Sequence, residues 1–383
     1  MPRAGYVFAM RVYPLIALAA LSCSPAAKSD GPDAAANTVA ASSPLPVASP
    51  TASPGIVPVT DTAVARHLGE LTTFGDWTIG CDNARACQAN ALVPETDDRD
   101  GYLLLLIERG GAPDAPARLI VPIGKTPPTH AMLTVDGKPF APLSGTGDTA
   151  TLTLDRARAA ALANGKTVAL TTPTGTPIAT VSLAGLAASL LYMDAQQQRV
   201  GTTSALRKPG AGTAPAELAL PVISMPPPST AKPATLSVAA ATKLIGPDNA
   251  FCDYAIGPIE PEAHRIDATH SLVLVAHPCG NGAYNLFSSA FVVEDSGNAT
   301  PARFDAPPGI AEEDKGDIIN ADWDAKAHRL TTYGKGRGIG DCGTIQAFAW
   351  DGTRFRLVEQ SAMGECRGSI DYIPVWRART ATR

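Results

Sequence analysis

Alternating apolar and polar positions predict strands across the first half of the folded chain. The segment Phe74 to Cys81, FGDWTIGC, alternates as a half-buried strand requires. Similar signals occupy residues 102–108, 118–122, 131–140, 167–171 and 178–183. The stretch 131–140 contains Asp136-Gly137, a dipeptide typical of two-residue hairpin turns. Two helices are predicted. One spans 155–164, with Asp155 near its N-terminal cap and Gly165 past its end, and the other spans 183–197, with apolar residues at helical spacing. This half is therefore predicted to be mainly β.

A second strand-rich region follows a short predicted helix at 238–245. The strands are expected at residues 271–276, 285–293, 302–304, 329–333, 343–350 and 353–360. Asp351-Gly352 joins the last two as a predicted hairpin. That turn would place Phe348 across from Phe355 as an aromatic cross-strand pair. The predicted fold class is mainly β, as sandwich or meander modules with a few short helices.

Two low-complexity segments flank the first predicted module. Residues 24–65 are rich in Ala, Ser and Pro and contain no aromatic residue, so we expect a disordered tether. Residues 208–235 include the run Pro226-Pro227-Pro228 and are predicted to be a linker. The predicted modules therefore span residues 66–207 and 236–383.

The N-terminus carries an export signal. Arg3 and Arg11 precede an apolar run of about ten residues, half of the ~20 that a membrane-spanning helix needs, so residues 1–23 are predicted to be a signal peptide. Ala20-Leu21-Ser22-Cys23 resembles the lipobox of bacterial lipoproteins, although Leu stands one position later than in that pattern. Either Cys23 is lipidated and anchors the protein to a membrane, or an ordinary signal is cleaved nearby. Both alternatives predict export to the periplasm or outer membrane.

The number of cysteines agrees with a lipidated Cys23. Of the seven cysteines, setting Cys23 aside leaves an even set of six, which an oxidising compartment can pair completely. Spacing favours sequential disulfides, joining Cys81 to Cys87, Cys252 to Cys279 and Cys342 to Cys366. The spacings C-x-x-C and C-x-x-H do not occur, so zinc is not expected.

Ordered cysteines and glycines carry a family resemblance. The segment Gly75-Asp76-Trp77, the cysteines at 81 and 87, and Gly185-Leu186 resemble the invasion-associated locus B module of exported bacterial proteins. Across nearly the whole predicted mature chain, the combination resembles the uncharacterised bacterial family catalogued as domain of unknown function 1176. Its further residues are Phe251-Cys252, Cys279-Gly280, Gly282-Ala283-Tyr284-Asn285 and the glycine-rich stretch 334–343. The resemblance implies a secreted or envelope protein and no known activity.

The glycine-rich stretch GKGRGIGDCG is the first candidate for a binding site. Its glycines alternate strictly between predicted strands, which is neither the Rossmann nor the P-loop spacing, so nucleotide binding is not expected. The simpler interpretation is a tight bend or a close approach of backbones in a sheet. If the stretch binds a ligand, Lys335, Arg337 and Asp341 are the predicted rim.

Other chemical patterns are weak. Ser229 and Lys232 match S-x-x-K but lie in the predicted linker, and Asn320, Asp322 and Asp324 alternate without the glycine and glutamate of a calcium loop. The run Glu312-Glu313-Asp314 is expected to be solvated surface. The six histidines are dispersed, at positions 67, 130, 264, 270, 277 and 328, and spacing alone leaves open a triad assembled in space. No cofactor and no metal site are predicted.

Charge and missing signatures narrow the function. The net charge of −5 is scattered without a basic stripe, so no nucleic-acid partner is expected. The favoured hypothesis is a non-enzymatic envelope protein that binds an unknown macromolecule of the envelope or of a host. The alternative is an envelope hydrolase with an unrecognised active site, which would show a concave pocket with hydrogen-bonded histidine or carboxylate pairs.

Overall fold

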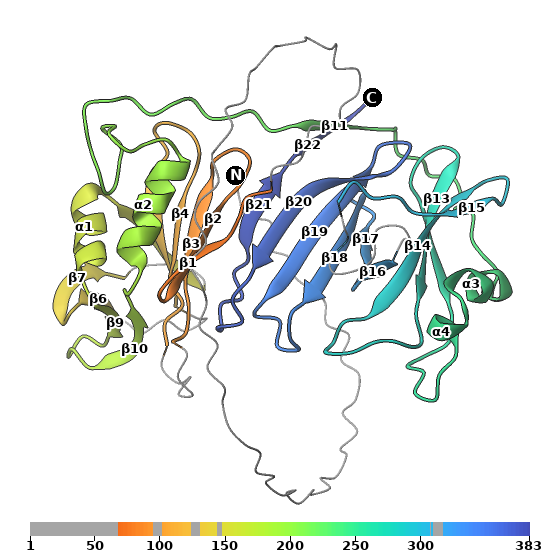
Figure 1. The fold of residues 1–383 in the computed structure, drawn as a ribbon, viewed down its shortest axis with the longest axis horizontal. Coiled ribbons are helices and arrows are strands. Elements are labelled where there is room, and N and C mark those ends of the chain that lie inside the picture. The colour runs from red at the N-terminus through yellow and green to blue at the C-terminus, as the bar shows by residue number, and fades with distance from the viewer. Residues whose placement is uncertain (1–67, 95–101, 124–130, 144–147, 307, 309–316) are drawn as a thin grey trace, which may run out of the picture. The chain divides into compact units, whose positions relative to one another are not determined.

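A computed structural model describes residues 68–94, 102–123, 131–143, 148–306, 308 and 317–383. It confirms a mainly β fold with a few short helices (Figure 1). The predicted signal peptide, Cys23 and the predicted tether lie outside the described residues, as do His67, His130 and the acidic run 312–314. Among the described residues, no helix is long and apolar enough to cross a membrane.

The N-terminal half is built from two antiparallel sheets. The six-stranded sheet has the order β1-β2-β3-β4-β5-β8, and the four-stranded sheet has the order β10-β9-β6-β7. Their strands are β1 (Thr72–Phe74), β2 (Trp77–Cys81), β3 (Cys87–Ala91), β4 (Leu106–Arg109), β5 (Ala117–Pro122), β6 (Met132–Val135), β7 (Lys138–Pro142), β8 (Thr149–Leu154), β9 (Thr167–Thr171) and β10 (Pro177–Ser182). Helices α1 (Arg156–Asn164) and α2 (Leu186–Gln196) complete this half. Asp155 caps α1 by accepting a hydrogen bond from the Arg158 N–H, as its position before the helix suggested.

The single strand predicted from Phe74 to Cys81 is wrong, because the chain turns back on itself there. Phe74 pairs with Trp77, so β1 and β2 form a hairpin. Gly75 has φ +57°, which a glycine adopts without strain, and an added Cβ would crowd the Ala184 carbonyl. The alternating pattern indicates strand on both sides, and the Gly75-Asp76 dipeptide inside it forms a two-residue turn.

A continuous apolar core unites the two N-terminal sheets and both helices. Trp77, Ile79, Leu119, Leu133 and Leu186 are completely buried in it. The Trp77 indole N–H donates to the Ser182 carbonyl at 2.9 Å, which satisfies the one polar group of this side chain. The core therefore fixes the position of α2 and of the loops that follow it.

The C-terminal half contains two five-stranded sheets, both antiparallel. One has the order β12-β13-β14-β15 with β16 also on β14, and the other has the order β17-β18-β19-β20-β21. Their strands are β12 (Pro261–Arg265), β13 (His270–Ala276), β14 (Phe287–Glu294), β15 (Ala299–Pro301), β16 (Asp317–Ile319), β17 (Asp322–Asp324), β18 (Arg329–Lys335), β19 (Gly343–Trp350), β20 (Phe355–Met363) and β21 (Ile373–Arg377). Helices α3 (Val238–Ile245) and α4 (Pro247–Ala250) precede them. The strand expected at 302–304 instead lies just before, as β15.

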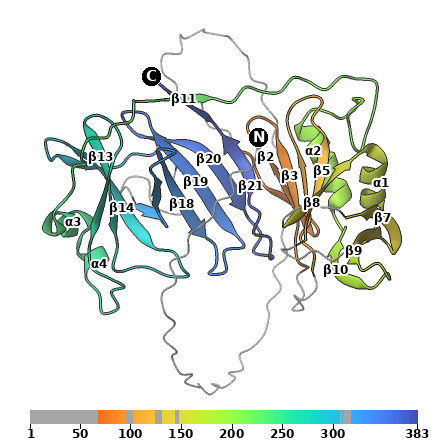
Figure 2. The same cartoon turned by 180° about the vertical axis from the view of Figure 1, so that it is seen from behind.

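The proline-rich segment contributes a strand. β11 (Val222–Met225) pairs in parallel with the C-terminal strand β22 (Arg379–Thr382), and Figures 1 and 2 both show the two side by side. Farther along, the Ala234 N–H donates to the Ser271 hydroxyl at 2.9 Å, which attaches the segment to β13. These contacts place the proline run against the C-terminal sheets.

The predicted pairing of Phe348 with Phe355 is wrong by two residues. Trp350 faces Phe355, and Phe348 faces Leu357 across the β19–β20 hairpin. The loop has four residues because the Asp351 carboxylate accepts from the N–H groups of Thr353 and Arg354 and extends the turn. Both phenylalanines are still completely buried, and each contacts the ring of Phe304.

The two halves contact each other through β3 and β21. Leu92 packs in a small cluster with Cys342, Met363 and Ile373. Around this cluster, Arg367 Nε donates to the Val93 carbonyl at 2.8 Å, and the Arg377 N–H donates to Asn83 Oδ1 at 2.8 Å. Polar hydrogen bonds therefore surround a limited apolar contact.

Candidate functional site

Three loops emerge at the same end of the C-terminal sheets. They follow β13, β18 and β20, at the lower edge of Figure 1, and comprise residues 277–286, 336–342 and 364–372. Because β18 and β20 are both antiparallel to β19, their loops must leave at one end. The predicted glycine-rich stretch is the middle loop of this group.

Two asparagine side chains fasten the first loop to β18. The Asn285 amide donates to the Lys335 carbonyl at 2.9 Å and accepts from the Lys335 N–H at 3.0 Å, as a neighbouring strand would. Asn320 accepts from the Leu286 N–H at 3.0 Å and donates to the Tyr333 carbonyl at 2.7 Å. Asn285 is buried, so these bonds replace a backbone ladder where the two sheets meet.

The glycines of the middle loop permit close approaches of neighbouring groups. A Cβ on Gly343 would overlap the Gly334 carbonyl, and one on Gly338 would lie 3.0 Å from the Tyr284 ring. Gly340 has φ +70°, and its carbonyl accepts from the Tyr333 hydroxyl at 2.7 Å. The predicted bend with close backbone approach is therefore confirmed.

The three predicted rim residues, Lys335, Arg337 and Asp341, lie in or beside this loop. Their charged groups do not converge on one position where a ligand could contact all three. Arg337 and Asp341 form an ion pair with each other, with Nε to Oδ1 at 2.6 Å, and Asp341 also accepts from the Gly368 N–H at 2.7 Å. The hydrogen bond from Arg337 keeps the pKa of the buried Asp341 carboxyl below its usual value. Lys335 Nζ lies 5.3 Å from the Tyr333 ring centroid and 5.9 Å from that of Tyr284. Asp341 therefore joins two loops, and Lys335 is held beside Tyr284. A ligand-binding role for the three residues stays a prediction.

Two disulfides hold these loops. The three disulfides of the described chain join the predicted pairs, Cys81–Cys87, Cys252–Cys279 and Cys342–Cys366. Cys342–Cys366 links the middle loop to the third loop. Cys252–Cys279 links the first loop to residues 251–257, and the Ile256 N–H donates to the Pro278 carbonyl at 3.0 Å beside it. Cross-links at these positions limit the movement of all four loops.

Large apolar side chains are exposed on the cross-linked loops. Tyr254 is 90% exposed, Tyr284 is 76% exposed and Ile339 is 68% exposed. Four further exposed apolar side chains belong to the same four loops, namely Phe251, Ile256, Leu286 and Ile370. We call these seven side chains the loop-end surface. Exposed aromatic residues on rigid loops at one end of a β scaffold are typical of protein-binding surfaces.

The backbone at Tyr284 is held in an unfavourable conformation. Ala283 and Tyr284 have φ values of +50° and +60°, in the left-handed region that bulky residues rarely adopt. The neighbouring Asn285 hydrogen bonds fix this turn and present the tyrosine ring outward. Strain at an exposed residue is commonly retained where it serves binding.

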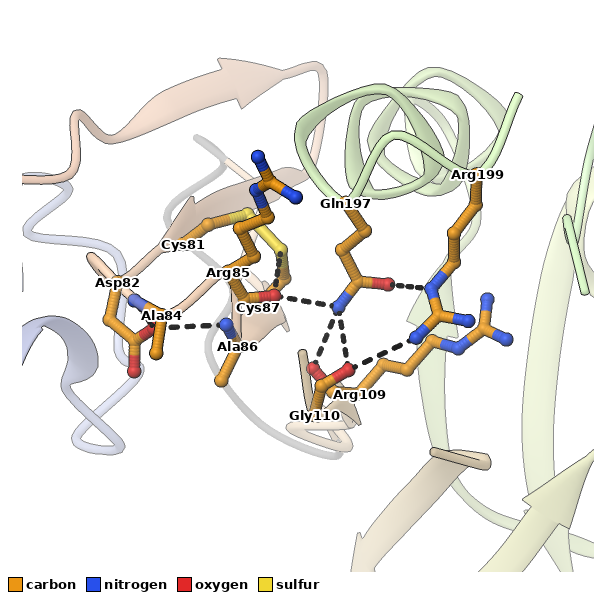
Figure 3. Close-up of a disulfide and its surroundings, with 10 residues drawn as sticks. All are labelled: Cys81, Asp82, Ala84, Arg85, Ala86, Cys87, Arg109, Gly110, Gln197 and Arg199. Atoms are coloured by element: carbon orange, nitrogen blue, oxygen red, sulfur yellow. Dashed lines mark hydrogen bonds between the residues drawn. A yellow bond between two sulfur atoms is a disulfide. The ribbon is translucent and has the colours of Figure 1, made fainter. Parts of the chain in front are cut away.

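A different polar cluster surrounds Cys81–Cys87 in the N-terminal half. Figure 3 shows the Gln197 amide donating to the carbonyls of Arg85, Arg109 and Gly110, at 2.9, 3.0 and 3.1 Å. Arg199, only 1% exposed, donates to Gln197 Oε1 at 3.0 Å and to the Pro113 carbonyl at 2.7 Å. Burial, followed by the nearby charge of Arg199, lowers the pKa of Arg109 to about 10.

The contacts of this polar cluster indicate that it stabilises the fold. The buried Asp194 accepts from the N–H groups of Leu206 and Arg207 at 3.1 and 2.8 Å, and its carboxylate lies 3.6 Å from Arg109 Nη1. Each charged group is thus used to tie the segment after α2 to the loops beside the disulfide. The sequence pattern did not reveal these residues, because they are ordinary polar positions until the fold brings them together.

Three histidine–carboxylate pairs bear on the hydrolase hypothesis. His264 Nε2 lies 3.1 Å from Glu262 Oε1, but the Glu262 side chain is 69% exposed, so this pair is not part of an enclosed site. Asp267 Oδ1 lies 3.0 Å from His270 Nδ1, but this carboxylate also accepts from the backbone N–H groups of Thr269 and His270 and from the Trp350 indole. It therefore shapes the turn between β12 and β13.

The third pair includes a serine. His277 Nε2 lies 2.8 Å from Ser289 Oγ, and Ser289 donates to Asp317 Oδ1 at 2.8 Å. Asp317 Oδ1 also lies 3.8 Å from His277 Nε2, the ring nitrogen that already contacts the serine. In a catalytic triad the carboxylate holds the other ring nitrogen of the histidine, so this arrangement has the wrong order. Burial lowers the pKa of His277, which keeps the imidazole neutral. The buried groups satisfy one another across β13, β14 and β16.

The remaining predicted patterns have separate positions. Ser229 accepts from the Ala231 N–H at 3.2 Å, and Lys232 presents its carbonyl to Arg265. Asp324 Oδ1 accepts from the N–H groups of Lys326 and Ala327, which forms the turn before β18. Among the described residues, no three His, Cys, Asp or Glu side chains are arranged to hold a metal ion.

The fold and site define a class: a mainly β protein whose loops are cross-linked by disulfides and carry exposed aromatic side chains. The chain belongs to the family described as protein of unknown function (DUF1176), whose model matches residues 71–383. It is 31% identical over 333 residues to the uncharacterized protein YpfG of Escherichia coli strain K12, covering 76% of this chain and 88% of that protein. It is also similar to the crystal structure of invasion associated protein B from Bartonella henselae, with 22% identity over 34% of this chain and 99% of that chain, and a TM-score of 0.26.

Proposed function

We propose that this protein is an exported, non-enzymatic binding protein whose loop-end surface contacts a partner protein. The observation that carries the proposal is the set of seven exposed apolar side chains on loops fixed by Cys252–Cys279 and Cys342–Cys366. Rigid loops reduce the entropy lost on binding, and aromatic rings supply contact area with few rotatable bonds. An apolar surface of this kind is unfavourable in water unless a partner covers it.

A matched set of variants tests this proposal. Tyr284→Ser and Ile339→Ser remove apolar area from the loop-end surface, whereas Ile178→Ser removes an exposed apolar side chain from the N-terminal half. The purified chain is used to capture proteins from an envelope extract of the cells that produce it, and captured proteins are identified by mass spectrometry. We expect both loop variants to lose a partner that the wild-type and Ile178→Ser proteins retain. Equal capture by all four proteins would contradict the proposal.

The proposed location of the protein in the cell envelope rests on its N-terminal sequence. A lipidated Cys23 would anchor the protein, and the following Ala/Ser/Pro-rich residues would allow the folded part to extend away from the membrane. Metabolic labelling with palmitate and cell fractionation compare wild-type protein with Cys23→Ala. Loss of label and release from the membrane fraction are expected. Unchanged membrane association would remove the lipid anchor from the proposal, without bearing on the loop-end surface.

A further inference from the structure

A separate cavity of about 530 Å³ lies between the edge strands β12 and β17. Its lining includes Ser229, Thr230, His264, Arg265, Trp323 and His328. A narrower space of about 60 Å³ shares Pro228, Trp323 and His328 with it and reaches Trp350. The larger volume falls within the ~300–1,000 Å³ typical of small-molecule sites.

The cavity is at the opposite end of the sheets from the loop-end surface. Arg265 ends β12 and pairs with Ser271 at the start of β13, whereas the first loop follows the end of β13. Trp323 likewise pairs with Leu330 near the start of β18, and the glycine-rich loop follows the end of β18. The two sites can therefore be altered independently.

The proline-rich wall of the cavity is fixed in place. Arg265 donates from Nη2 to the Lys232 carbonyl and from Nη1 to Asp295 Oδ1, the latter at 2.8 Å. Ala234 is bonded to Ser271, as described above. Nη1 and Nη2 of Arg265 therefore hold the wall, and the charge of the guanidinium is balanced by Asp295. Its buried Nε has no hydrogen-bond partner among the described residues.

Three aromatic rings form one side of the cavity. The His264 ring is stacked on Trp323, with ring centroids 5.9 Å apart and an interplanar angle of 27°. The His328 ring meets Trp323 edge-on, at 6.2 Å and 83°. His328 has φ +52°, in a turn stabilised by the Asp324 carboxylate. The turn thus fixes an imidazole beside a half-buried indole.

The chemistry of the lining favours a neutral polyhydroxyl ligand. No carboxylate is among the lining residues, which disfavours a cation, and the nearby Glu262 carboxylate lies 3.1 Å from His264 Nε2. The one guanidinium is paired with Asp295, which disfavours an anion. Hydroxyl and imidazole groups can both donate and accept hydrogen bonds, and the indole offers an apolar face. We propose that this cavity binds a saccharide, with an apolar face of a sugar ring against Trp323 and its hydroxyls toward Ser229, Thr230, His264 and His328.

Intrinsic fluorescence offers a direct test on the full chain. Of the four tryptophans, Trp77, Trp350 and Trp376 are at most 8% exposed, so emission changes on ligand addition report mainly on Trp323. The probes are cellobiose, maltose and N,N′-diacetylchitobiose, with benzoate and tetramethylammonium as anionic and cationic controls. We expect a saturable change with at least one sugar and none with either ion.

Variants separate this site from the loop-end surface. Trp323→Ala and His328→Gly are each expected to weaken sugar binding at least ~tenfold, or about 1.4 kcal/mol, as measured by calorimetry. Glycine suits the positive φ at His328, so this variant removes the imidazole without new backbone strain. Tyr284→Ser is expected to leave sugar binding unchanged. The proposal would be overturned by no saturable response to any of the sugars below ~10 mM, by full affinity in His328→Gly, or by tighter binding of benzoate or tetramethylammonium.

Discussion

Buried polar side chains have different roles around Cys81–Cys87 and at the loop-end surface. Near Cys81–Cys87, Gln197 and Arg199 are buried and spend their donors on backbone carbonyls. At the loop-end surface, Asn285 and Asp341 are also buried and bonded, but they hold exposed aromatic and aliphatic side chains above them. The first arrangement joins buried segments of the fold, and the second holds apolar side chains in an exposed position. A buried polar network therefore does not by itself indicate a binding site. The exposed side chains that such a network holds in place are the evidence for one.

The largest change in stability is expected when the buried network near Cys81–Cys87 loses Arg199. Arg199→Ala would leave the carbonyls of Ala112 and Pro113 without their donor and remove the partner of Gln197. We expect the free energy of unfolding to fall by about 3–5 kcal/mol in urea titrations, because buried acceptors lose their hydrogen bonds. Partner capture by the folded fraction should be unchanged. The control Arg118→Ala removes an exposed side chain and should cost less than ~0.5 kcal/mol; equal losses would contradict the account.

Removing Cys342–Cys366 should affect both stability and binding. The paired change Cys342→Ser with Cys366→Ser is expected to lower the free energy of unfolding by about 2–4 kcal/mol, because the unfolded chain gains freedom. Partner capture should also be lost, because the second and third loops are no longer joined by this cross-link. Reduced stability with full capture would show that the disulfide serves the fold alone.

His277 predicts a pH dependence within the C-terminal half. Its pKa is lowered from the ordinary 6.5, mainly by burial, so the unfolded chain binds a proton that the folded chain does not. The stabilising effect is complete above pH 6.5 and is lost as pH falls from there through the folded pKa. Urea titrations between about pH 7 and 5 should show wild-type stability falling more steeply than that of His277→Gln. Parallel curves for the two proteins would contradict this assignment.

The smallest change in stability is expected where backbone strain is released. Tyr284→Gly and Arg85→Gly both replace a residue at positive φ, one on the loop-end surface and one beside Cys81–Cys87. Each should change the free energy of unfolding by less than ~1 kcal/mol, since relief of strain offsets the greater entropy of the unfolded glycine. Only Tyr284→Gly should lose partner capture. Loss of capture in both variants would contradict the proposed location of the site.

The sequence predicted what depends on local pattern. Strands β19 and β20, the capping Asp155 and the sequential pairing of the cysteines follow from short sequence patterns and from spacing along the chain. The register of Phe348 differs from the prediction because the Asp351 side chain lengthens the turn. The β1–β2 turn differs because the Gly75-Asp76 signal lies inside an alternating pattern whose first strand has only three residues.

The candidate site was only partly visible. The glycine-rich stretch drew attention to Lys335, Arg337 and Asp341, but the exposed Tyr254 and Ile370 carry no local signal. In the sequence Asn320 is one member of an Asn/Asp alternation, whereas in the structure its amide joins the first loop to β18. Such contacts depend on chain segments far apart in the sequence, so they require the fold.

Site-specific photo-crosslinking shows directly whether the loop-end surface contacts a partner protein. A benzophenone amino acid is placed at position 284, at position 339, or at position 178 as the exposed control, and the full chain is irradiated in producing cells. We expect the same covalent protein adduct from positions 284 and 339, and no such adduct from position 178. An adduct equally strong at position 178, or none at positions 284 and 339, would contradict a partner-binding role for the loop-end surface.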